Sequence, residues 1–240
     1  MIMEWFKVRS TQPELMDDHG GSTTPLFRTL DQFSIINALF SRNRFLAKTL
    51  IIPHMRRQQG RSKPFSICDL GSGGCDFALW LSAYLADRSI PARIYCVDND
   101  PRVVEFARNR CHGNDNIVVV NESALRFTDA GICPDYVFAN HLLHHLPDEE
   151  LVALLGLVHR SARLGYVLND LVRSKRSYVL FMLFASLVLR NGYARSDGLR
   201  SIEKGFTTSE LESFVNRAEI APPPRLERFF PGRIVLYKFN

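Results

Sequence analysis

The chain has 240 residues and a mass of 27.4 kDa, which suits one α/β domain with an added lid rather than two full domains. Its net charge of +5 is mild, and its densest basic run, 56–63, lacks interleaved aromatic residues, so nucleic acid is not an expected partner. Five cysteines without a CxxC pair exclude a disulfide scaffold or zinc site and favour reduced thiols in a cytoplasmic protein.

The N-terminal quarter of the chain divides into two parts. The composition of residues 1–25 predicts a loosely packed segment. From Leu26 to Met55, apolar residues recur at helical spacing, which predicts helix. A basic loop, Arg56–Lys63, then separates this helical region from the first predicted strand.

From Pro64 onward, short apolar runs alternate with helix-like runs. The predicted strands are Phe65–Leu70, Arg93–Val97, Ile117–Val120, Tyr136–Ala139 and Gly165–Leu168. The predicted helices are Cys75–Ala86, Pro101–Arg110 after the N-cap Asp100, and one opened by the acids at 148–150. Such alternation predicts a doubly wound α/β fold, in which helices cover both faces of a mostly parallel sheet.

The last third of the chain begins with a long apolar helix candidate, Leu171–Arg190. Its most apolar stretch, 178–189, is too short to span a bilayer, which needs about 20 residues. It is interpreted as a buried lid helix, as the wall of an apolar acceptor pocket, or as a surface that touches a membrane transiently. A capping-box sequence at Thr207 predicts the helix Glu210–Arg217. Two strands, 225–230 and 233–239, are predicted after it.

The first strand ends in a glycine turn that carries chemical information. Asp69, Gly71 and Gly73 form a D-x-G-x-G pattern, and Asp98 ends the next strand. A dinucleotide-binding turn needs a third glycine where Asp76 stands, and no G-K-[ST] ending marks a P-loop. The turn therefore indicates a nucleoside ligand that is cationic and lacks phosphate.

Four segments in this order resemble the class I S-adenosylmethionine-dependent methyltransferases: ICDLGSGGCDFA, YCVDNDPRVVEFAR, VVVNESALRF and PDYVFANHLLHHLPDEEL. The resemblance is strong over residues 64–170 and loose elsewhere. It implies a seven-stranded sheet closed by a final hairpin and S-adenosylmethionine as cofactor. It also implies an N-terminal helical cover, 1–63, and a methyltransferase core, 64–240, with a lid insertion, 171–206.

The resemblance also implies which residues bind the cofactor. Asp69 meets the methionine ammonium group, and Asp98 holds the ribose hydroxyls. Asn99 flanks the adenine, and Asn140 lies at the edge where cofactor and acceptor meet. Ser123 stands where the family commonly has an aspartate that reads the adenine amino group. The remaining residues expected to contact the cofactor are Gly71, Ser72, Gly73, Cys75 and Ala124.

Candidate catalytic and acceptor-binding residues follow the fourth and fifth strands. His144 or His145 could act as general base for an acceptor hydroxyl, and the pair could equally serve packing and helix entry. Asn169, Asp170 and Arg173 could orient the acceptor, or Arg173 could simply pair with Asp170. No carboxylate or histidine cluster in the sequence argues for a metal.

The motif order is similar to that of small-molecule methyltransferases of quinone biosynthesis and polyketide tailoring. This similarity favours O-methylation of a small, hydrophobic, phenolic or quinone-like acceptor. N- or C-methylation of another metabolite is the near alternative, and a non-catalytic binding protein of this fold is the distant one. The sequence leaves the oligomeric state open.

Overall fold

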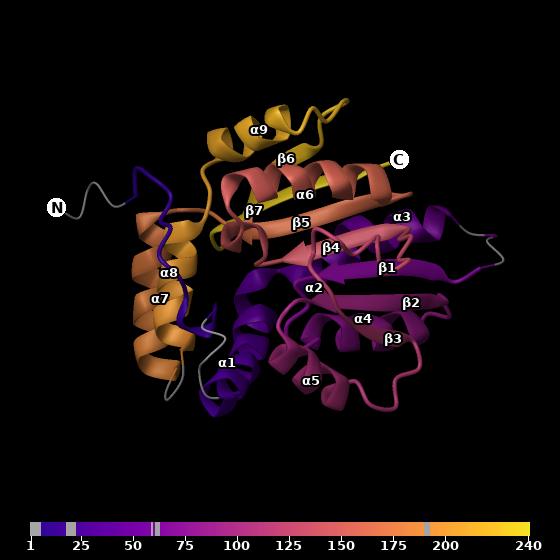
Figure 1. Cartoon of the computed structure of the whole chain (residues 1–240), viewed down its shortest axis with the longest axis horizontal. Helices are drawn as coiled ribbons and strands as arrows, with labels where there is room; N and C mark the ends of the chain where they lie inside the picture. Colours follow the sequence, from indigo (N-terminus) through magenta and orange to yellow (C-terminus); the bar gives the residue numbers. More distant parts are fainter. Residues whose placement is uncertain (1–5, 18–22, 59, 61–62, 190–192) are drawn as a thin grey trace.

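The computed structural model describes residues 6–17, 23–58, 60, 63–189 and 193–240. Its centre is a seven-stranded sheet in the order β3-β2-β1-β4-β5-β7-β6 (Figure 1). Strands β1 to β5 are mutually parallel, and β7 is antiparallel to both of its neighbours, β5 and β6. The predicted doubly wound sheet with a closing hairpin is confirmed. The strands are β1 (Phe65–Leu70), β2 (Ala92–Asp98), β3 (Ile117–Asn121), β4 (Tyr136–Asn140), β5 (Gly165–Leu171), β6 (Arg225–Phe229) and β7 (Arg233–Phe239).

Helices cover both faces of the sheet because the strands between them are apolar on both sides. In β1, Cys68 and Leu70 pack with α6 (Asp148–Ser161) and α9 (Thr208–Arg217) on one face. Ile67 points to the other face, where α3 (Ile52–Arg57) and α4 (Asp76–Ala86) bury their apolar sides. Helix α5 (Pro101–Arg110) packs beside β2 and β3.

Three further helices stand at the end of the sheet where the parallel strands terminate: α1 (Thr23–Ile36), α7 (Lys175–Val188) and α8 (Ala194–Lys204) (Figure 1). Helices α7 and α8 pack against each other, and α8 also contacts α1 and the short 3-10 helices η1 (Leu15–Asp17) and η4 (Leu143–His145). Ligands of open α/β sheets bind at this end of the strands, so these helices enclose the expected ligand site.

Local sequence signals placed several helix starts correctly. Asp100 accepts a hydrogen bond from the backbone N–H of Arg102 as the N-cap of α5. Thr207 and Glu210 form the predicted capping box at the start of α9. In both cases a short side chain satisfies backbone donors that have no partner inside the helix.

The helical pattern predicted for Leu26–Met55 is confirmed, although the region is divided into several helical elements. Arg42 adopts a left-handed conformation, φ 60°, and separates α1 with the π-helical turn η2 (Asn37–Ser41) from the helical run that follows. That run consists of α2 (Asn43–Leu46), the π-helical turn η3 (Ala47–Ile51) and α3. Apolar residues continue on both sides of the break, so periodicity could not show it.

The predicted helix Leu171–Arg190 begins later than expected, at Lys175, and residue 190 lies outside the described residues. Strand β5 continues through Asn169 and Asp170 to Leu171, all paired with β7. The polar residues Asn169 and Asp170 suggested the end of the strand, but in the fold their side chains form hydrogen bonds with buried partners. Helix α8 was not predicted, because its sequence is mostly polar and has few apolar residues at helical spacing to mark the side that packs on α7.

Candidate active site

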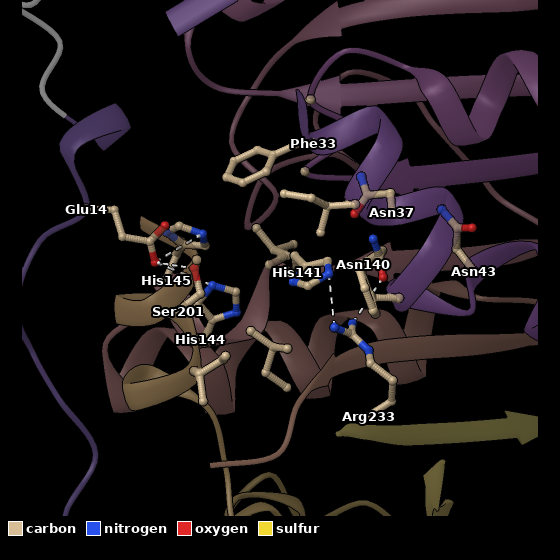
Figure 2. Close-up of a pocket in the computed structure, with 18 of the residues that line it drawn as sticks. Glu14, Phe33, Asn37, Asn43, Asn140, His141, His144, His145, Ser201 and Arg233 are labelled. Carbon is tan, nitrogen blue, oxygen red and sulfur yellow. Dashed lines mark hydrogen bonds and ion pairs between the residues drawn. The ribbon is translucent and has the colours of Figure 1, made fainter. Parts of the chain in front are cut away.

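A cavity of about 930 Å³ opens at the carboxyl ends of β1, β2 and β4. Its volume lies in the range of ligand sites in proteins, roughly 300–1,000 Å³. The cofactor-type motif residues line one end of it, and residues from α1, α7 and the β6–β7 turn line the other. Figure 2 shows residues from both sides of this cavity facing one another across open space.

The turn after β1 brings bare backbone to the cavity. Gly71 adopts φ 65° and Gly73 φ 51°, which are left-handed conformations that favour glycine. A Cβ on Gly71 would lie 3.0 Å from a methyl carbon of Leu142. The backbone N–H groups of Gly71 and Ser72 both donate to the carbonyl of Val97, which ties the turn to β2.

Three carboxyl groups, those of Asp69, Asp76 and Asp98, surround this turn. Asp69 is only 3% exposed, and its burial raises its pKa well above the usual range. The neighbouring charges of Asp76 and Asp98 raise that pKa further. Among the described residues, no Lys, Arg or His forms an ion pair with Asp69. This end of the cavity is therefore suited to a cationic ligand.

Asp98 is held in place by the turn itself. Its Oδ2 accepts from the N–H of Gly73 at 3.0 Å, and its Oδ1 accepts from the N–H of Asp100 at 3.2 Å. Each carboxylate oxygen can accept a further bond, so two ligand hydroxyls can be bound here. A second cavity of about 90 Å³ adjoins Asp98; Ser123, Ala124 and Leu142 are among its lining residues.

A buried histidine lies between two carboxylates on the opposite wall. The Nδ1 of His144 lies 2.7 Å from Oδ1 of Asp170, and its Nε2 lies 3.5 Å from Oε1 of Glu14. Burial alone would lower the pKa of His144, but Asp170 and Glu14 together raise it to about 9. His144 is therefore an imidazolium at neutral pH in this arrangement, whereas a general base must be unprotonated.

Glu14 comes from an N-terminal strap, residues 6–17, that crosses α8 and η4. The glutamate is 3% exposed and accepts a hydrogen bond from Ser201 Oγ at 3.0 Å. Lys204 Nζ lies 3.4 Å from the same carboxylate oxygen. Arg9 fixes the strap by donating to the backbone carbonyls of Lys204, His144 and Leu146. The expectation of loose packing is wrong for residues 6–17; residues 1–5 and 18–22 lie outside the described residues.

A third polar cluster centres on Arg233, the first residue of β7. Its guanidinium donates to Oδ1 of Asn140 at 3.2 Å and to Nε2 of His141 at 3.0 Å (Figure 2). It also donates to Oδ1 of Asn169 at 3.1 Å. Burial and the charge of Arg233 lower the pKa of His141 well below its usual range, so this ring is neutral and accepts. The sequence had not indicated Arg233 or His141 as site residues. The available signal for Arg233 was an arginine at the start of an otherwise apolar strand.

Aromatic side chains form the wall between α1 and α7. Phe33, Phe40, Phe181 and Phe184 line the cavity and pack around a small buried cluster. On α7, Leu180 lines the cavity while it is 58% exposed, and Leu183 and Leu187 are also exposed. Among the described residues, no helix is long and apolar enough to cross a membrane. The predicted transient contact of this helix with a membrane surface stays a prediction.

Comparison with known proteins matches this geometry to one family. The family described as "Methyltransferase domain" matches residues 67–165, which include the glycine turn, both strand-end acids and the histidine segment. The chain therefore contains a methyltransferase-type domain in residues 67–165. The match supports an enzyme that transfers methyl groups. No curated protein sequence matches the chain.

Solved structures share the fold of this chain at low sequence identity. The plantazolicin methyltransferase BpumL, crystallised with a pentazolic desmethyl analogue and S-adenosylhomocysteine, is 13% identical with a TM-score of 0.65 over 93% of each chain. Human N-acetylserotonin methyltransferase is 13% identical with a TM-score of 0.61, covering 99% of this chain and 64% of its own. A methyltransferase from Aquifex aeolicus is 15% identical with a TM-score of 0.51, covering 78% of this chain and 88% of its own.

The residues around the glycine turn fit the predicted cofactor. S-adenosylmethionine carries two positive groups and no phosphate, and the unpaired carboxyl groups of Asp69 and Asp98 complement it. The predicted cofactor residues that line one cavity or the other are Asp69, Gly71, Ser72, Gly73, Asp98, Asn99, Ser123, Ala124 and Asn140.

Cys75 is placed differently from the prediction. It is the N-cap of α4 in a left-handed conformation, φ 58°, and its side chain is fully buried in the core beneath the turn. The thiol packs there with Cys96 and Cys111 and lines neither of the two cavities. A small side chain at this position serves the packing of the turn on the sheet.

The three residues that were predicted to bind the acceptor lie behind the cavity wall. Asn169, Asp170 and Arg173 are buried and do not line the cavity. Asp170 holds His144, and Asn169 holds Arg233. Arg173 pairs with Glu210 rather than with Asp170, and it donates to the carbonyl of Gly205 at 2.7 Å. The first two residues can therefore act only through their partners, and Arg173 fastens the lid to the core.

Glu14, His144 and His145 form a group with metal-ligand character, which the sequence had not suggested. Their ligand atoms lie within 4.8 Å of one another. However, Lys204 Nζ and Ser201 Oγ already occupy the same oxygen of Glu14. A lysine ammonium at that position opposes a second cation, so the arrangement is explained by an ion-pair network.

Proposed function

We propose that the chain transfers the methyl group of S-adenosylmethionine to a hydroxyl oxygen of a small, hydrophobic, phenolic or quinone-like acceptor. The observation that supports this most is the continuity of the large cavity. It joins the acidic cofactor end at Asp69 and Asp98 to an aromatic end at Phe33 and Phe184. An apolar acceptor bound at the aromatic end would face the cofactor without an intervening wall.

The cofactor supplies the electrophilic methyl group, so the protein contributes mainly alignment and exclusion of water. Asp69 would hold the ammonium group, Asp98 the ribose hydroxyls, and the small cavity beside Ser123 and Ala124 the adenine. Asn140, at the end of β4, would mark where the methyl group meets the acceptor. The cover, residues 1–63, and the lid insertion, 171–206, would enclose the acceptor.

The two histidines differ in their fitness for proton removal. His144 is held as a cation between Asp170 and Glu14, and it could accept a proton only after losing its own, with Glu14 withdrawn. His145 is 26% exposed and lies 3.5 Å from Asp17. We propose that His144 fastens the strap over the site in the closed protein, and that removal of the acceptor proton does not depend on it.

Incubation with methyl-labelled S-adenosylmethionine and a panel of alkylphenols and matched alkylamines tests the proposal. Labelled ethers are expected from the phenols, with turnover lost in Asp98→Ala. Labelled amines without ethers would contradict O-methylation and favour N-methylation. The absence of any product from a protein that binds the cofactor would favour a non-catalytic role.

A further inference from the structure

Arg233 is a buried cation at the acceptor end of the cavity. It is 1% exposed, and it lines the cavity together with Phe230, Pro231 and Gly232 of the β6–β7 turn. Burial lowers the pKa of Arg233 to about 10, while the more distant charge of Asp170 opposes that effect. The guanidinium is therefore charged at neutral pH.

No carboxylate among the described residues forms an ion pair with this guanidinium. Its three hydrogen-bond partners among the described residues are neutral acceptors: the amide oxygens of Asn140 and Asn169 and the neutral ring of His141. Asp170 bonds to His144 and to the N–H of Leu171 instead. Burying an arginine without a directly paired anion is costly, and proteins avoid it unless a ligand completes the pair.

The guanidinium has donors left for such a ligand. It carries five N–H groups, of which Nε and one on each terminal nitrogen are used. One N–H therefore remains on each terminal nitrogen, and these two groups can donate to an oxyanion. In Figure 2, the guanidinium extends toward Asn140 and His141, where the cavity begins.

The lining charges of the cavity are distributed unevenly around its wall. Carboxyl groups line the cofactor end and the strap, whereas Arg176, Arg228 and Arg233 line the side formed by α7 and the β6–β7 hairpin. A ligand that spans this cavity would be cationic at one end and anionic at the other. S-adenosylmethionine supplies the cationic groups. Its own carboxylate is on the same carbon as the ammonium group expected beside Asp69, so an anion at the arginine side would belong to the acceptor.

We propose that Arg233 binds the acceptor as an oxyanion, either a phenolate or enolate or a carboxylate, and presents that oxygen beside Asn140 for methylation. This inference rests on the proposed function, whose acceptor class it narrows to compounds with an acidic hydroxyl or carboxyl group. Arg233 is then a catalytic residue, since it contacts the reacting oxygen.

The chemistry balances without a base inside the closed site. The acceptor releases its proton to water as it binds to Arg233. Its oxygen then forms a bond to the methyl carbon as the sulfur–carbon bond breaks. An anion and a sulfonium become a neutral ether or ester and a neutral thioether. This account agrees with His144 being held as a cation.

The test is a spectroscopic titration of a chromogenic alkyl-nitrophenol bound to the protein in the presence of S-adenosylhomocysteine. Phenolate absorbance reports ionisation directly, without turnover. A cation in direct contact should lower the pKa of the bound phenol by about 1 to 3 units. Arg233→Lys should keep part of that shift, and Arg233→Met should remove it. Arg108→Met, which removes an exposed positive charge on α5, should leave it intact.

Arg233→Met could fail to fold, so calorimetric binding of S-adenosylhomocysteine is measured for each variant. Should that variant be lost, the wild-type titration still decides, because a bound phenol that ionises at the same pH as the free phenol overturns the proposal. A full shift retained in folded Arg233→Met also overturns it. Ether products from alkylphenols and ester products from alkylbenzoates distinguish the two sources of oxyanion.

The same experiments distinguish a failure of this inference from a failure of the proposed function. If the wild-type protein makes ethers or esters but shows no shift and no dependence on Arg233, the inference fails and the proposed function stands. If the shift is present but no oxygen is methylated by the wild-type protein, the proposed function fails while Arg233 remains an oxyanion site.

Discussion

The two ends of the large cavity are built in different ways. The cofactor end comes from consecutive strand–turn–helix units, and its key residues, Asp69 and Asp98, lie at the ends of neighbouring parallel strands. The acceptor end is assembled from the strap, α1, α7 and the β6–β7 hairpin, which are distant in sequence. The cofactor end is acidic and is built from segments that are close in the sequence. The acceptor end is mostly apolar and contains a buried arginine. Changes at one end should therefore leave the other largely unaffected.

The largest expected effect is at the cofactor end. In its proposed role, Asp98 accepts two charge-assisted hydrogen bonds from the ribose, each contributing about 1.5–3 kcal/mol. Asp98→Ala removes both. We expect affinity for S-adenosylhomocysteine, measured by calorimetry, to fall by at least about 100-fold. Asp115→Ala, in an exposed loop, is the matched control. Affinity within a fewfold of wild type would show that Asp98 does not hold the cofactor.

A second prediction concerns the ion pairs that join the strap to the core. The folded-state pKa of His144, about 9, lies above the unfolded value near 6.5, so folding favours the protonated ring. This stabilisation is fully present below pH 6.5 and is lost as pH rises through 9. The free energy of unfolding should fall by on the order of 3 kcal/mol across that window. It should be measured by denaturant titration at each pH.

His144→Gln provides the comparison for this pH dependence. The variant lacks the titrating ring, so its stability should change little between pH 6.5 and 9.5. His112→Gln, which removes an exposed histidine, should keep the wild-type profile. A parallel decline in all three proteins would assign the titration to other groups.

A third, smaller effect tests the lid without touching the cofactor end. A Cβ on Gly198 in α8 would collide with the ring of Phe181 in α7. Overpacking of this kind costs about 1–3 kcal/mol. Gly198→Ala should lower the thermal midpoint and raise the KM for the acceptor, with unchanged affinity for S-adenosylhomocysteine. Arg195→Ala, on the exposed side of α8, is the control. A loss of cofactor affinity would show that the two ends are coupled.

The smallest effect expected is on the pH dependence of cofactor binding. Burial and two neighbouring carboxylates raise the pKa of Asp69, and the cofactor ammonium favours its ionised form. Binding should therefore weaken as pH falls through that raised pKa, by at most about tenfold per pH unit. Asp69→Asn should bind more weakly overall and with a shallower slope. An affinity that is constant across the acidic range would contradict this role.

The contrast between the two ends also explains what could be predicted from the sequence. Gly71, Gly73 and the strand-end acids act through backbone conformation and position on a sheet, and both are encoded within a few residues. Asp100 and Thr207 indicated the starts of α5 and α9 for the same reason. Each of these signals depends on neighbours in the chain, so a single sequence shows it.

The acceptor end could not be predicted because its contacts join distant segments. Glu14 meets His144 and Ser201 only after the strap has crossed α8, and Arg233 reaches Asn140 only across the sheet. Asn169 and Asp170 stood at the ligand end of β5, which suggested contact with an acceptor. In the fold they face inward and position Arg233 and His144. The prediction that Cys75 contacts the cofactor was wrong for a different reason. Its left-handed backbone directs the thiol into the core.

A crystal structure of the protein with S-adenosylhomocysteine tests the central claim most directly. The account predicts the ribose on Asp98, the amino group beside Asp69, the adenine near Ser123, and the sulfur directed past Asn140 toward the space before Arg233. A nucleoside bound elsewhere, or a sulfur directed away from the aromatic end of the cavity, would contradict the account.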